Sequence, residues 1–498
     1  MTDPRNMEPG ERGRDAALLL SLTAAALLLR FFRIGAESLW LDEAYSWHLS
    51  SADALSTLTG SVGNRHTPPL YYFLLHFWMY FGSSETVLRS LSALFGALSV
   101  PLAYGLGRDL LGRAPARIGA ALFAFAPFLV YYGQEARGYT LLVFLVLLLH
   151  RLLLRYVSEG RARDGALFAL VAVISLYTHY YAGFVLVAAN VFAIVELRRR
   201  RGLLARWLAV QALIAGAYAP WIVNLLTAGF GGGQIFRRFL FSQVPYSFLR
   251  FTLGYGLLPL SPEAKADMTG FVARNLPLLA AAALSFGALL AAGVRSVSGR
   301  PGRFLLVHLL VPVVLALAVS LRSNLISERY LIVTYPCFAL FLAAGFGAAR
   351  SAATRTAAAA AIALTLFGLG AHYFNPRAGK ADWREAAALV GREGEAGDVV
   401  LLAPSFIDLP FCYYFDRREG PPMEVRGLQS AEGFDENRFE REWETIGRAN
   451  RWWLVASHTE RTDFYRRLMG ARGREIDCVF LPEENGITIS LFERGNGR

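Results

Sequence analysis

Two adjacent carboxylates, Asp42 and Glu43, follow directly after the first long apolar stretch of the chain, within the sequence LDEAYSW. Acidic residues at a membrane boundary are costly unless they face a polar cavity, and they are therefore candidates for function. A carboxylate here is suited to accept the proton of an attacking hydroxyl as a general base, or to hold a metal ion. The alternative is a solvated pair at the start of a helix, where Asp42 would be a favourable N-cap.

A second group of polar residues lies in the sequence YYGQEARGY, which joins two apolar stretches. Its candidate substrate-binding residues are Tyr132, Gln134, Glu135, Arg137 and Tyr139. A guanidinium is suited to grip a phosphate, whereas phenol and amide groups suit the hydroxyls of a sugar. The alternative is a loop in which the glutamate and the arginine pair with each other and the tyrosines lie at headgroup level.

Three further motifs each contribute one candidate residue: RHTPPLYY contains His66, YTHYY contains His179 and ERY contains Arg329. His66 is suited to proton transfer or phosphate binding, although a lone histidine is more often structural. An aromatic belt at the membrane interface explains YTHYY equally well. Arg329 is placed to meet a lipid phosphate or to extend towards the headgroups.

The elements that position these residues are membrane helices. The chain has 498 residues, of which 54% are hydrophobic and only 18% are charged, whereas soluble proteins have about a quarter of their residues charged. Apolar stretches long enough to cross a ~30 Å hydrocarbon core recur along three-quarters of the chain. The composition excludes a soluble enzyme, a coiled coil and a disordered protein. We predict about eleven spans, near residues 16–32, 87–106, 116–132, 139–154, 166–182, 183–197, 207–224, 276–293, 304–320, 330–347 and 357–373.

The net charge of +11 comes almost entirely from arginine, since Lys265 and Lys380 are the only lysines. The arginines are scattered through short loops between spans. This distribution is typical of residues that set the orientation of a membrane protein, and not of a surface that binds nucleic acid. The positive-inside rule then places the N-terminus in the cytoplasm and, with an odd number of spans, the C-terminus outside the plasma (inner) membrane. The candidate motifs all fall on the outer side. One helix more or fewer would move the C-terminal part to the other side.

Two outer segments, residues 42–82 and 225–275, are predicted to contain helices that lie in the interface. From residue 376 charges become frequent and helices alternate with strands, which predicts a small extracytoplasmic α/β domain. We therefore expect two domains, residues 1–375 and 376–498. Cys412 and Cys478 both fall in the second domain, where a disulfide is conceivable.

The motifs LDEAYSW, HTPPLYYFLLHFW, GSSETVLRSLSALFG, YYGQEARGYTL, YTHYY, ERYLIVTYP and DWREAAALV, in this order, resemble the GT-C glycosyltransferases. The similarity is to family 39, the branch akin to protein O-mannosyltransferases, aminoarabinose transferases and the Rhizobium lipopolysaccharide-core glycosyltransferases. It covers about residues 15–390. It implies a GT-C-like α-helical multi-spanning membrane protein that moves a sugar from a polyprenyl-phosphate carrier to a lipid, glycan or protein acceptor of the cell envelope.

The resemblance also implies roles for particular residues. The acidic pair of the first outer loop supplies the catalytic carboxylate, which falls on Asp42 with Glu43 beside it. Glu135 and Arg137 fall in the active-site segment of the second outer loop. His66 lies in the PPLYY stretch, and Arg329 lies in the late RYL motif near the carrier phosphate.

We expect no bound cofactor and no metal ligands, because this chain has Asp-Glu where metal-dependent relatives have Asp-X-Asp; a divalent metal is not excluded. The carrier phosphate would be held by Arg137, Arg329 or an arginine between residues 237 and 250. A transporter or flippase of lipid-linked glycans is the main alternative, and a membrane anchor for the C-terminal domain is the other. Nucleic acid is not an expected partner.

Overall fold

The computed structural model describes residues 9–59, 67–228, 242–259, 267–321, 326–376, 379–446, 449–459, 461–482 and 486–494. The chain divides into two compact units. The helical unit comprises Met1–Ile34, Leu49–Leu258 and Val272–Phe374. The sheet unit comprises Gly35–His48, Pro259–Phe271 and Asn375–Arg498. The expected domains differ from these units in one respect, because the two earlier segments join the C-terminal residues.

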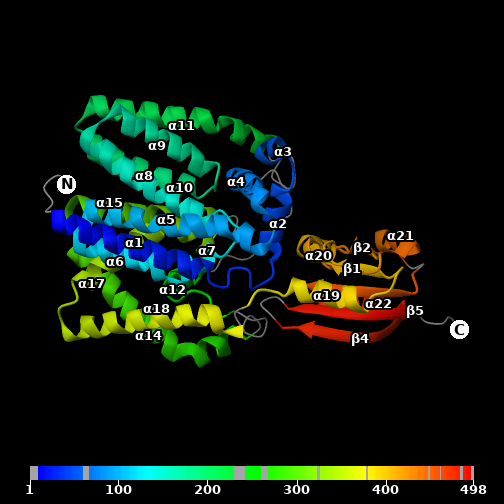
Figure 1. The fold of residues 1–498 in the computed structure, drawn as a ribbon. Helices are drawn as coiled ribbons and strands as arrows, with labels where there is room; N and C mark the ends of the chain where they lie inside the picture. The colour runs from blue at the N-terminus through cyan, green and yellow to red at the C-terminus, as the bar shows by residue number, and fades with distance from the viewer. Residues whose placement is uncertain are drawn as a thin grey trace. The chain divides into compact units, whose positions relative to one another are not determined.

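The helical unit is a bundle of long apolar helices (Figure 1). Its first half contains α1 (Pro9–Phe31), α3 (Ala54–Thr59), α4 (Leu70–Trp78), the 3-10 turn η2 (Met79–Phe81), α5 (Glu85–Leu111), α6 (Arg113–Phe125), α7 (Pro127–Gly133), α8 (Tyr139–Glu159), α9 (Ala162–Leu176) and α10 (Ala182–Leu197). Its second half contains α11 (Arg201–Ala228), α12 (Gln243–Leu253), α14 (Met268–Ser296), α15 (Gly299–Ser320), α16 (Glu328–Leu331), η3 (Ile332–Thr334), α17 (Tyr335–Gly347) and α18 (Ala352–Phe374). The first residues of α14 belong to the sheet unit.

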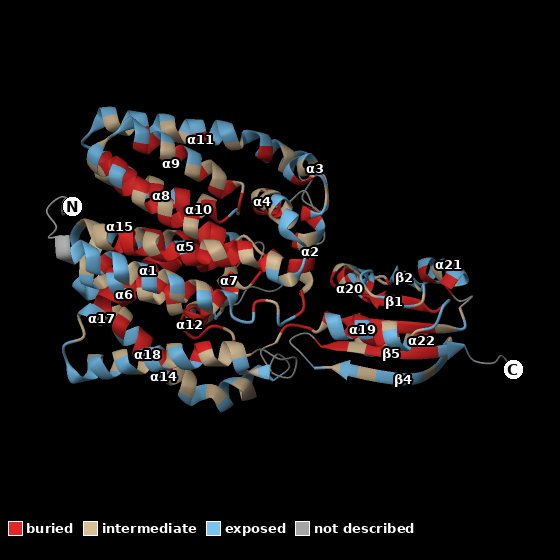
Figure 2. Ribbon diagram, in the orientation of Figure 1, coloured by how far each residue is buried: buried red, intermediate tan, exposed pale blue. Residues whose placement is uncertain are grey.

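The centre of the bundle is formed by α5, which packs against α1, α6 and α8. Most of α8 is buried, whereas few residues of α11 and α18 are buried, and their ribbons are mainly exposed or intermediate in Figure 2. Exposed leucine and phenylalanine along a whole helix face are expected where lipid replaces water as the solvent. Burial in the helical unit therefore falls from its central helices to the lipid-facing ones.

Every predicted span overlaps helical residues, although span 116–132 is divided between α6 and α7, span 330–347 covers α16, η3 and α17, and span 166–182 extends beyond the end of α9. Among the described residues, seven helices are long and apolar enough to cross a membrane, or eight if the bent pair α6 and α7 counts as one span. The helices α1, α9 and α10 are not among them. The multi-spanning helical fold is thus confirmed, while the count of eleven spans is not.

Short helices occupy the segments predicted to lie in the interface. In residues 42–82 these are α2 (Leu41–Ser50), α3 and α4, and in residues 225–275 the short helix is α12. The glycine-rich stretch and the first arginines of the latter segment, up to residue 241, lie outside the described residues. Most of α2 belongs to the sheet unit.

The sheet unit contains a five-stranded sheet in the order β2-β1-β3-β5-β4. The strands are β1 (Val399–Ala403), β2 (Glu424–Gly427), β3 (Arg451–Ser457), β4 (Gly473–Leu481) and β5 (Ile487–Arg494). Strand β1 is parallel to β2 and β3, and β5 is antiparallel to β3 and β4. The helices are α19 (Trp383–Glu393), η5 (Ser405–Ile407), α20 (Asp408–Phe415), α21 (Glu436–Ile446) and α22 (Thr462–Gly470).

Two apolar clusters account for the stability of this sheet. Trp383 of α19 and Phe411 of α20 pack against alternate residues of β1, including Val400, while Phe439 of α21 and Tyr465 of α22 belong to the other cluster. Because both faces are covered, all five residues of β1 are buried. The predicted C-terminal α/β fold is therefore confirmed. Strand β2 and helix α21 were not predicted, since their sequences EVRG and ENRFEREWETI are dominated by polar residues.

The disulfide that the sequence left open is absent from the described residues. Cys412 and Cys478 are both free thiols, as is Cys337, which is buried in α17. The sheet unit is therefore held together by its two apolar clusters without a cross-link between these two cysteines.

Candidate active site

The segment between α7 and α8 carries three of the predicted site residues, Gln134, Glu135 and Arg137, while Tyr132 lies in α7 and Tyr139 begins α8. Its first residue, Gln134, ends α7 and donates from Nε2 to the carbonyl oxygens of Phe32 at 2.8 Å and Arg30 at 3.0 Å. Its Oε1 lies 2.8 Å from Nε2 of His372 in α18. These contacts tie the end of α1 to α18, while the predicted binding of a sugar hydroxyl by Gln134 stays a prediction. The structure thus gives this side chain a role in positioning the segment.

Arg137 lies in an aromatic frame at the same end of the bundle. Its Nη1 donates to the hydroxyl of Tyr72 in α4 at 3.0 Å, and its guanidinium carbon lies 6.0 Å and 5.8 Å from the ring centroids of Tyr72 and Tyr139. Its carbonyl oxygen accepts a hydrogen bond from Ser92 Oγ of α5 at 3.0 Å. Main chain and side chain are both held, so the guanidinium has a defined direction.

His179 lies in the connection between α9 and α10. Its Nδ1 accepts a hydrogen bond from the main-chain N–H of Tyr181 at 3.1 Å, so the neutral ring carries its proton on Nε2. Burial, together with the positive charges of Arg137 and Arg329, lowers the pKa of His179 to about 3. At neutral pH the imidazole is therefore an uncharged N–H donor beside two cations.

Arg329 belongs to the one-turn helix α16. Its guanidinium carbon lies 5.3 Å from the ring centroid of Tyr330, and the Tyr330 ring lies 5.2 Å from that of His179. The Tyr139 ring lies 5.9 Å from His179 on the α8 side. Three segments far apart in sequence thus bring two arginines and one neutral histidine together within an aromatic surround. This group, Arg137, His179 and Arg329 with their tyrosines, is named the arginine cluster below.

A second polar chain runs beside Tyr132 of α7, which is buried. The Tyr132 hydroxyl lies 2.6 Å from the Tyr255 hydroxyl, and Tyr255 donates to Glu328 Oε1 at 2.8 Å. The Arg250 guanidinium of α12 lies 4.9 Å from the Tyr255 ring centroid and donates from Nε to the Tyr246 hydroxyl at 2.6 Å. Tyr255 and Tyr246 were not predicted. No motif marks them, because their importance comes only from the packing of α12 against α7 and α16.

Two predicted residues remain, Glu135 and His66, and the structure describes only the first of them. Glu135 is 1% exposed in the connection between α7 and α8. His66 lies outside the described residues. Within the described chain, no group of three or more His, Cys, Asp or Glu side chains is arranged to hold a metal ion.

The acidic pair lies in the first turn of α2, in the sheet unit. Glu43 is fully buried, and its Oε2 lies 3.1 Å from Nζ of Lys380, whose side chain is 5% exposed. Asp42, its neighbour, is only half-buried. Lys380 was not predicted as a site residue, although its rarity set it apart, since the chain has two lysines in 498 residues. Glu43 is thus engaged in a buried ion pair.

The chain before α2 is fastened to the C-terminal residues of the same unit. Ser38 Oγ donates to the Ala381 carbonyl at 2.7 Å and accepts from the Trp383 N–H at 3.2 Å. The Leu39 N–H donates to the Tyr414 hydroxyl at 2.6 Å. These contacts, with the Glu43–Lys380 pair, fix the start of the helix that carries Asp42.

Comparison with known proteins agrees with this architecture. The family model described as dolichyl-phosphate-mannose-protein mannosyltransferase matches residues 66–231. The structure has the fold of the GT-C glycosyltransferases, and the resemblance that the motifs predicted is confirmed.

Two solved structures illustrate the fold. ArnT from Cupriavidus metallidurans in the apo state superposes with a TM-score of 0.59 over 96% of this chain and 98% of its own, at 14% identity. The same protein has been solved with undecaprenyl phosphate bound. The oligosaccharyltransferase AglB from Archaeoglobus fulgidus, in complex with an inhibitory peptide and a dolichol-phosphate, gives a TM-score of 0.53 over 92% of this chain and 71% of its own, at 13% identity. No curated protein matches the chain at the significance required.

Proposed function

We propose that this protein is an integral-membrane glycosyltransferase that moves a sugar from a polyprenyl-phosphate carrier to an acceptor of the cell envelope. The observation that carries the proposal is the arginine cluster, in which two guanidinium groups and a neutral histidine meet at one end of an apolar bundle. Such a group suits the phosphate of a lipid-linked substrate, because guanidinium binds phosphate through charge-assisted hydrogen bonds. The match to the mannosyltransferase model supports the same chemistry.

The arginine cluster has two tasks in this proposal. Arg137 and Arg329 bind the phosphate of the donor and stabilise the negative charge that develops on it as the sugar leaves. His179 adds an N–H donor without adding a third positive charge, because its pKa is about 3. Tyr139 offers ring surface to the sugar, and Tyr132 supports this side of the site through its hydrogen bond to Tyr255.

Asp42 is the proposed general base. The carboxylate takes the proton of the acceptor hydroxyl or amine as that oxygen or nitrogen attacks the anomeric carbon. The bond from the anomeric carbon to the phosphate oxygen breaks, and polyprenyl phosphate leaves with the bonding electron pair. A single displacement of this kind inverts the anomeric configuration. A product that retains the donor's configuration would contradict this step. Glu43, by contrast, is assigned to holding α2 through Lys380.

The orientation follows from the arginine distribution. We propose that the N-terminus is cytoplasmic, that the sheet unit is extracytoplasmic and that the protein resides in the plasma (inner) membrane. The candidate motifs then face the side on which envelope glycans are assembled.

The decisive experiment is carried out in the native host. The gene is deleted, mass spectrometry identifies the envelope glycan that loses a sugar, and the strain is complemented with wild type or Asp42→Asn at matched membrane levels. We expect wild type to restore the sugar and Asp42→Asn to lower transfer about 10²- to 10⁴-fold, the usual contribution of a general base. Full restoration by Asp42→Asn would exclude Asp42 as the base.

An assay with the purified protein distinguishes a glycosyltransferase from the alternative, a transporter or flippase. With a labelled lipid-phosphate sugar in detergent, a glycosyltransferase transfers the label to a new covalent product, whereas a flippase leaves the donor intact. Arg329→Gln serves as the matched phosphate-site variant. We expect it to raise the KM for the donor and also to lower kcat, because Arg329 both binds the phosphate and stabilises the charge that develops on it.

A further inference from the structure

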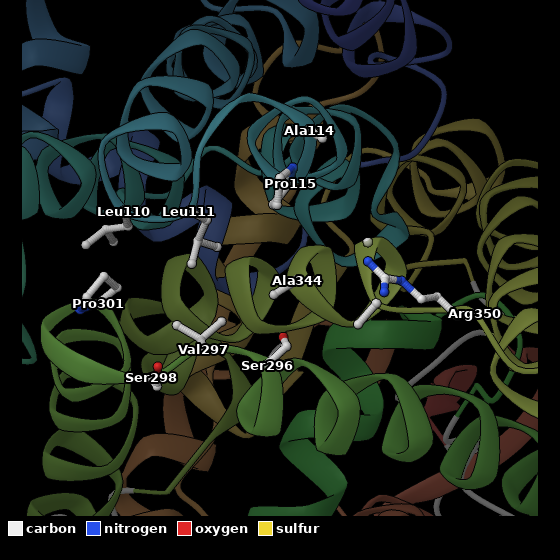
Figure 3. A pocket seen from close by; sticks show the side chains of 12 residues that line it. Leu110, Leu111, Ala114, Pro115, Ser296, Val297, Ser298, Pro301, Ala344 and Arg350 are labelled. Atoms are coloured by element: carbon white, nitrogen blue, oxygen red, sulfur yellow. The ribbon is translucent and has the colours of Figure 1, made fainter. Parts of the chain in front are cut away.

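A hollow of about 690 Å³ opens in the helical unit where α5, α14 and α17 end and α6 and α15 begin. Figure 3 shows its lining, in which Leu110, Leu111 and Val297 provide apolar surface. It is remote from the arginine cluster, because Ser92, which holds Arg137, and Leu111 are separated by roughly 28 Å along α5 at 1.5 Å per residue. The hollow is therefore a separate feature of the bundle.

The polar part of the lining favours an anion. Arg350 is exposed at the edge of the hollow, and among the described residues it has no ion pair. The first turns of α6 and α15 both line the hollow, through Pro115 and Pro301. Pro115 and Pro301 have no N–H, so the donors of these turns are the N–H groups of the residues before them, which include Ala114 of the lining. Neither helix has a side-chain N-cap hydrogen bond, so these N–H groups and the helix dipoles remain uncompensated by a cap. Ser298, the N-cap residue of α15, adds a hydroxyl.

The position of the hollow along the helices favours the headgroup of a lipid as the anion. It lies at the arginine-rich ends of helices that are long and apolar enough to span the membrane, which is the headgroup level of the leaflet on that side. The nearby Arg113 and Arg300 form ion pairs with Glu11 and Glu196, respectively. Arg350 is therefore the cationic residue of the lining that we expect to bind the anion. Basic pockets between membrane helices on the cytoplasmic side bind the headgroups of anionic lipids.

We infer that this hollow binds an anionic phospholipid, with the phosphodiester at Arg350 and the first turns of α6 and α15, and an acyl chain along Leu110, Leu111 and Val297. The inference does not depend on the glycosyltransferase activity. It assigns the arginine-rich end of the bundle a lipid ligand distinct from the substrate of the proposed reaction.

The test uses the full-length protein purified in detergent. Binding of phosphatidylglycerol and of phosphatidylcholine with the same acyl chains is measured by native mass spectrometry. We expect phosphatidylglycerol to bind more tightly, and Arg350→Gln to weaken it about fivefold, the effect of one basic residue beside an anionic lipid. Arg355→Gln is the matched control, because Arg355 is exposed in α18 on the same side but does not line the hollow. Its binding should equal that of wild type.

A second variant tests the hollow itself. Ala114→Trp adds bulk at an exposed residue of the lining and should reduce phosphatidylglycerol binding without unfolding the protein. Equal losses in Arg350→Gln and Arg355→Gln, or undiminished binding in Ala114→Trp, would overturn the inference. Competition by millimolar inorganic phosphate without any preference for the lipid would show a free-anion site instead and would also overturn it.

Discussion

At the scale of residues, the two adjacent carboxylates Asp42 and Glu43 differ in burial. Glu43 is fully buried and meets Lys380 at 3.1 Å, whereas Asp42, one residue earlier, is half-buried in the first turn of α2. The buried carboxylate is occupied by its ion pair, whereas the carboxylate at the partly accessible helix start is the one that we propose as the base. This division leaves Asp42 as the stronger candidate for the base.

The Glu43–Lys380 pair provides a stability prediction. Removing one partner leaves the other charge buried and uncompensated, so Glu43→Gln and Lys380→Met should each lower the free energy of unfolding by about 3 kcal/mol. The double variant should lose much less than the sum. Thermal unfolding of the four proteins in one detergent measures the coupling. Additive losses would show that the pair contributes nothing as a unit.

The pKa of His179 predicts a pH dependence of stability. Its pKa is about 3 in the folded chain and about 6.5 when unfolded. Between these values the unfolded chain binds the proton and the folded chain does not. Stability is therefore complete above pH 6.5 and falls as the pH drops towards 3, by about 2 kcal/mol at pH 5. In His179→Gln the loss between pH 7 and pH 5 should shrink, as measured by thermal unfolding. An unchanged acid sensitivity would contradict the low pKa.

At the scale of elements, the joint between α6 and α7 depends on a residue that no motif marks. The two helices meet at a bend of 51°, which leaves the last carbonyls of α6 without helical partners. Arg30 of α1, fully buried, donates to the carbonyl oxygens of Phe123 at 3.0 Å and Ala124 at 3.3 Å. This contact compensates the break that directs α7 and the YYGQEARGY segment.

A glycine beside Arg30 makes this joint testable. A Cβ at Gly133 would lie 2.8 Å from Cγ of Arg30, which is too close for a real contact, whereas a Cβ at Gly216 of α11 would meet nothing within 4 Å. We expect Gly133→Ala to destabilise the protein by about 1–3 kcal/mol and to reduce sugar transfer. Gly216→Ala should be neutral or slightly stabilising, since alanine favours a helix. Equal behaviour of the two variants in thermal unfolding and in the transfer assay would refute the role of Arg30.

At the scale of the whole molecule, the chain crosses between its two units several times. Residues 35–48 leave the helical unit after α1 and join the sheet unit, and the chain returns at Leu49. The base candidate therefore belongs to the same compact unit as the C-terminal sheet, while the arginine cluster belongs to the bundle. Deleting the C-terminal residues would remove Lys380 and the contacts that hold α2.

The proposed orientation of the whole chain is tested with its own cysteines. Cys478 is exposed on β4, whereas Cys337 is buried in α17. In spheroplasts a membrane-impermeant maleimide should label the wild type, and Cys478→Ser should lose most of the label. Labelling that appears only after the membrane is lysed would place the sheet unit in the cytoplasm and reverse the proposed topology.

Much of the architecture was readable from the sequence. Apolar length predicted helices wherever the structure has one of the long helices, and alternating patterns predicted most helices and strands of the C-terminal α/β fold. These features are local, because hydrophobicity and propensity act within a few turns of chain. Polar elements such as β2 and α21 were missed for the same reason, since their own residues carry little apolar pattern.

The sequence by itself determined that this is a multi-spanning helical protein with a C-terminal α/β unit and which motifs carry polar chemistry. Only the tertiary structure decided which residues meet: Glu43 with Lys380, 337 positions apart, and His179 with Arg137 and Arg329. It also showed Gln134 connecting the end of α1 with α18. Such pairings depend on how distant helices pack, and the packing of side chains across segments leaves no periodic trace along the chain.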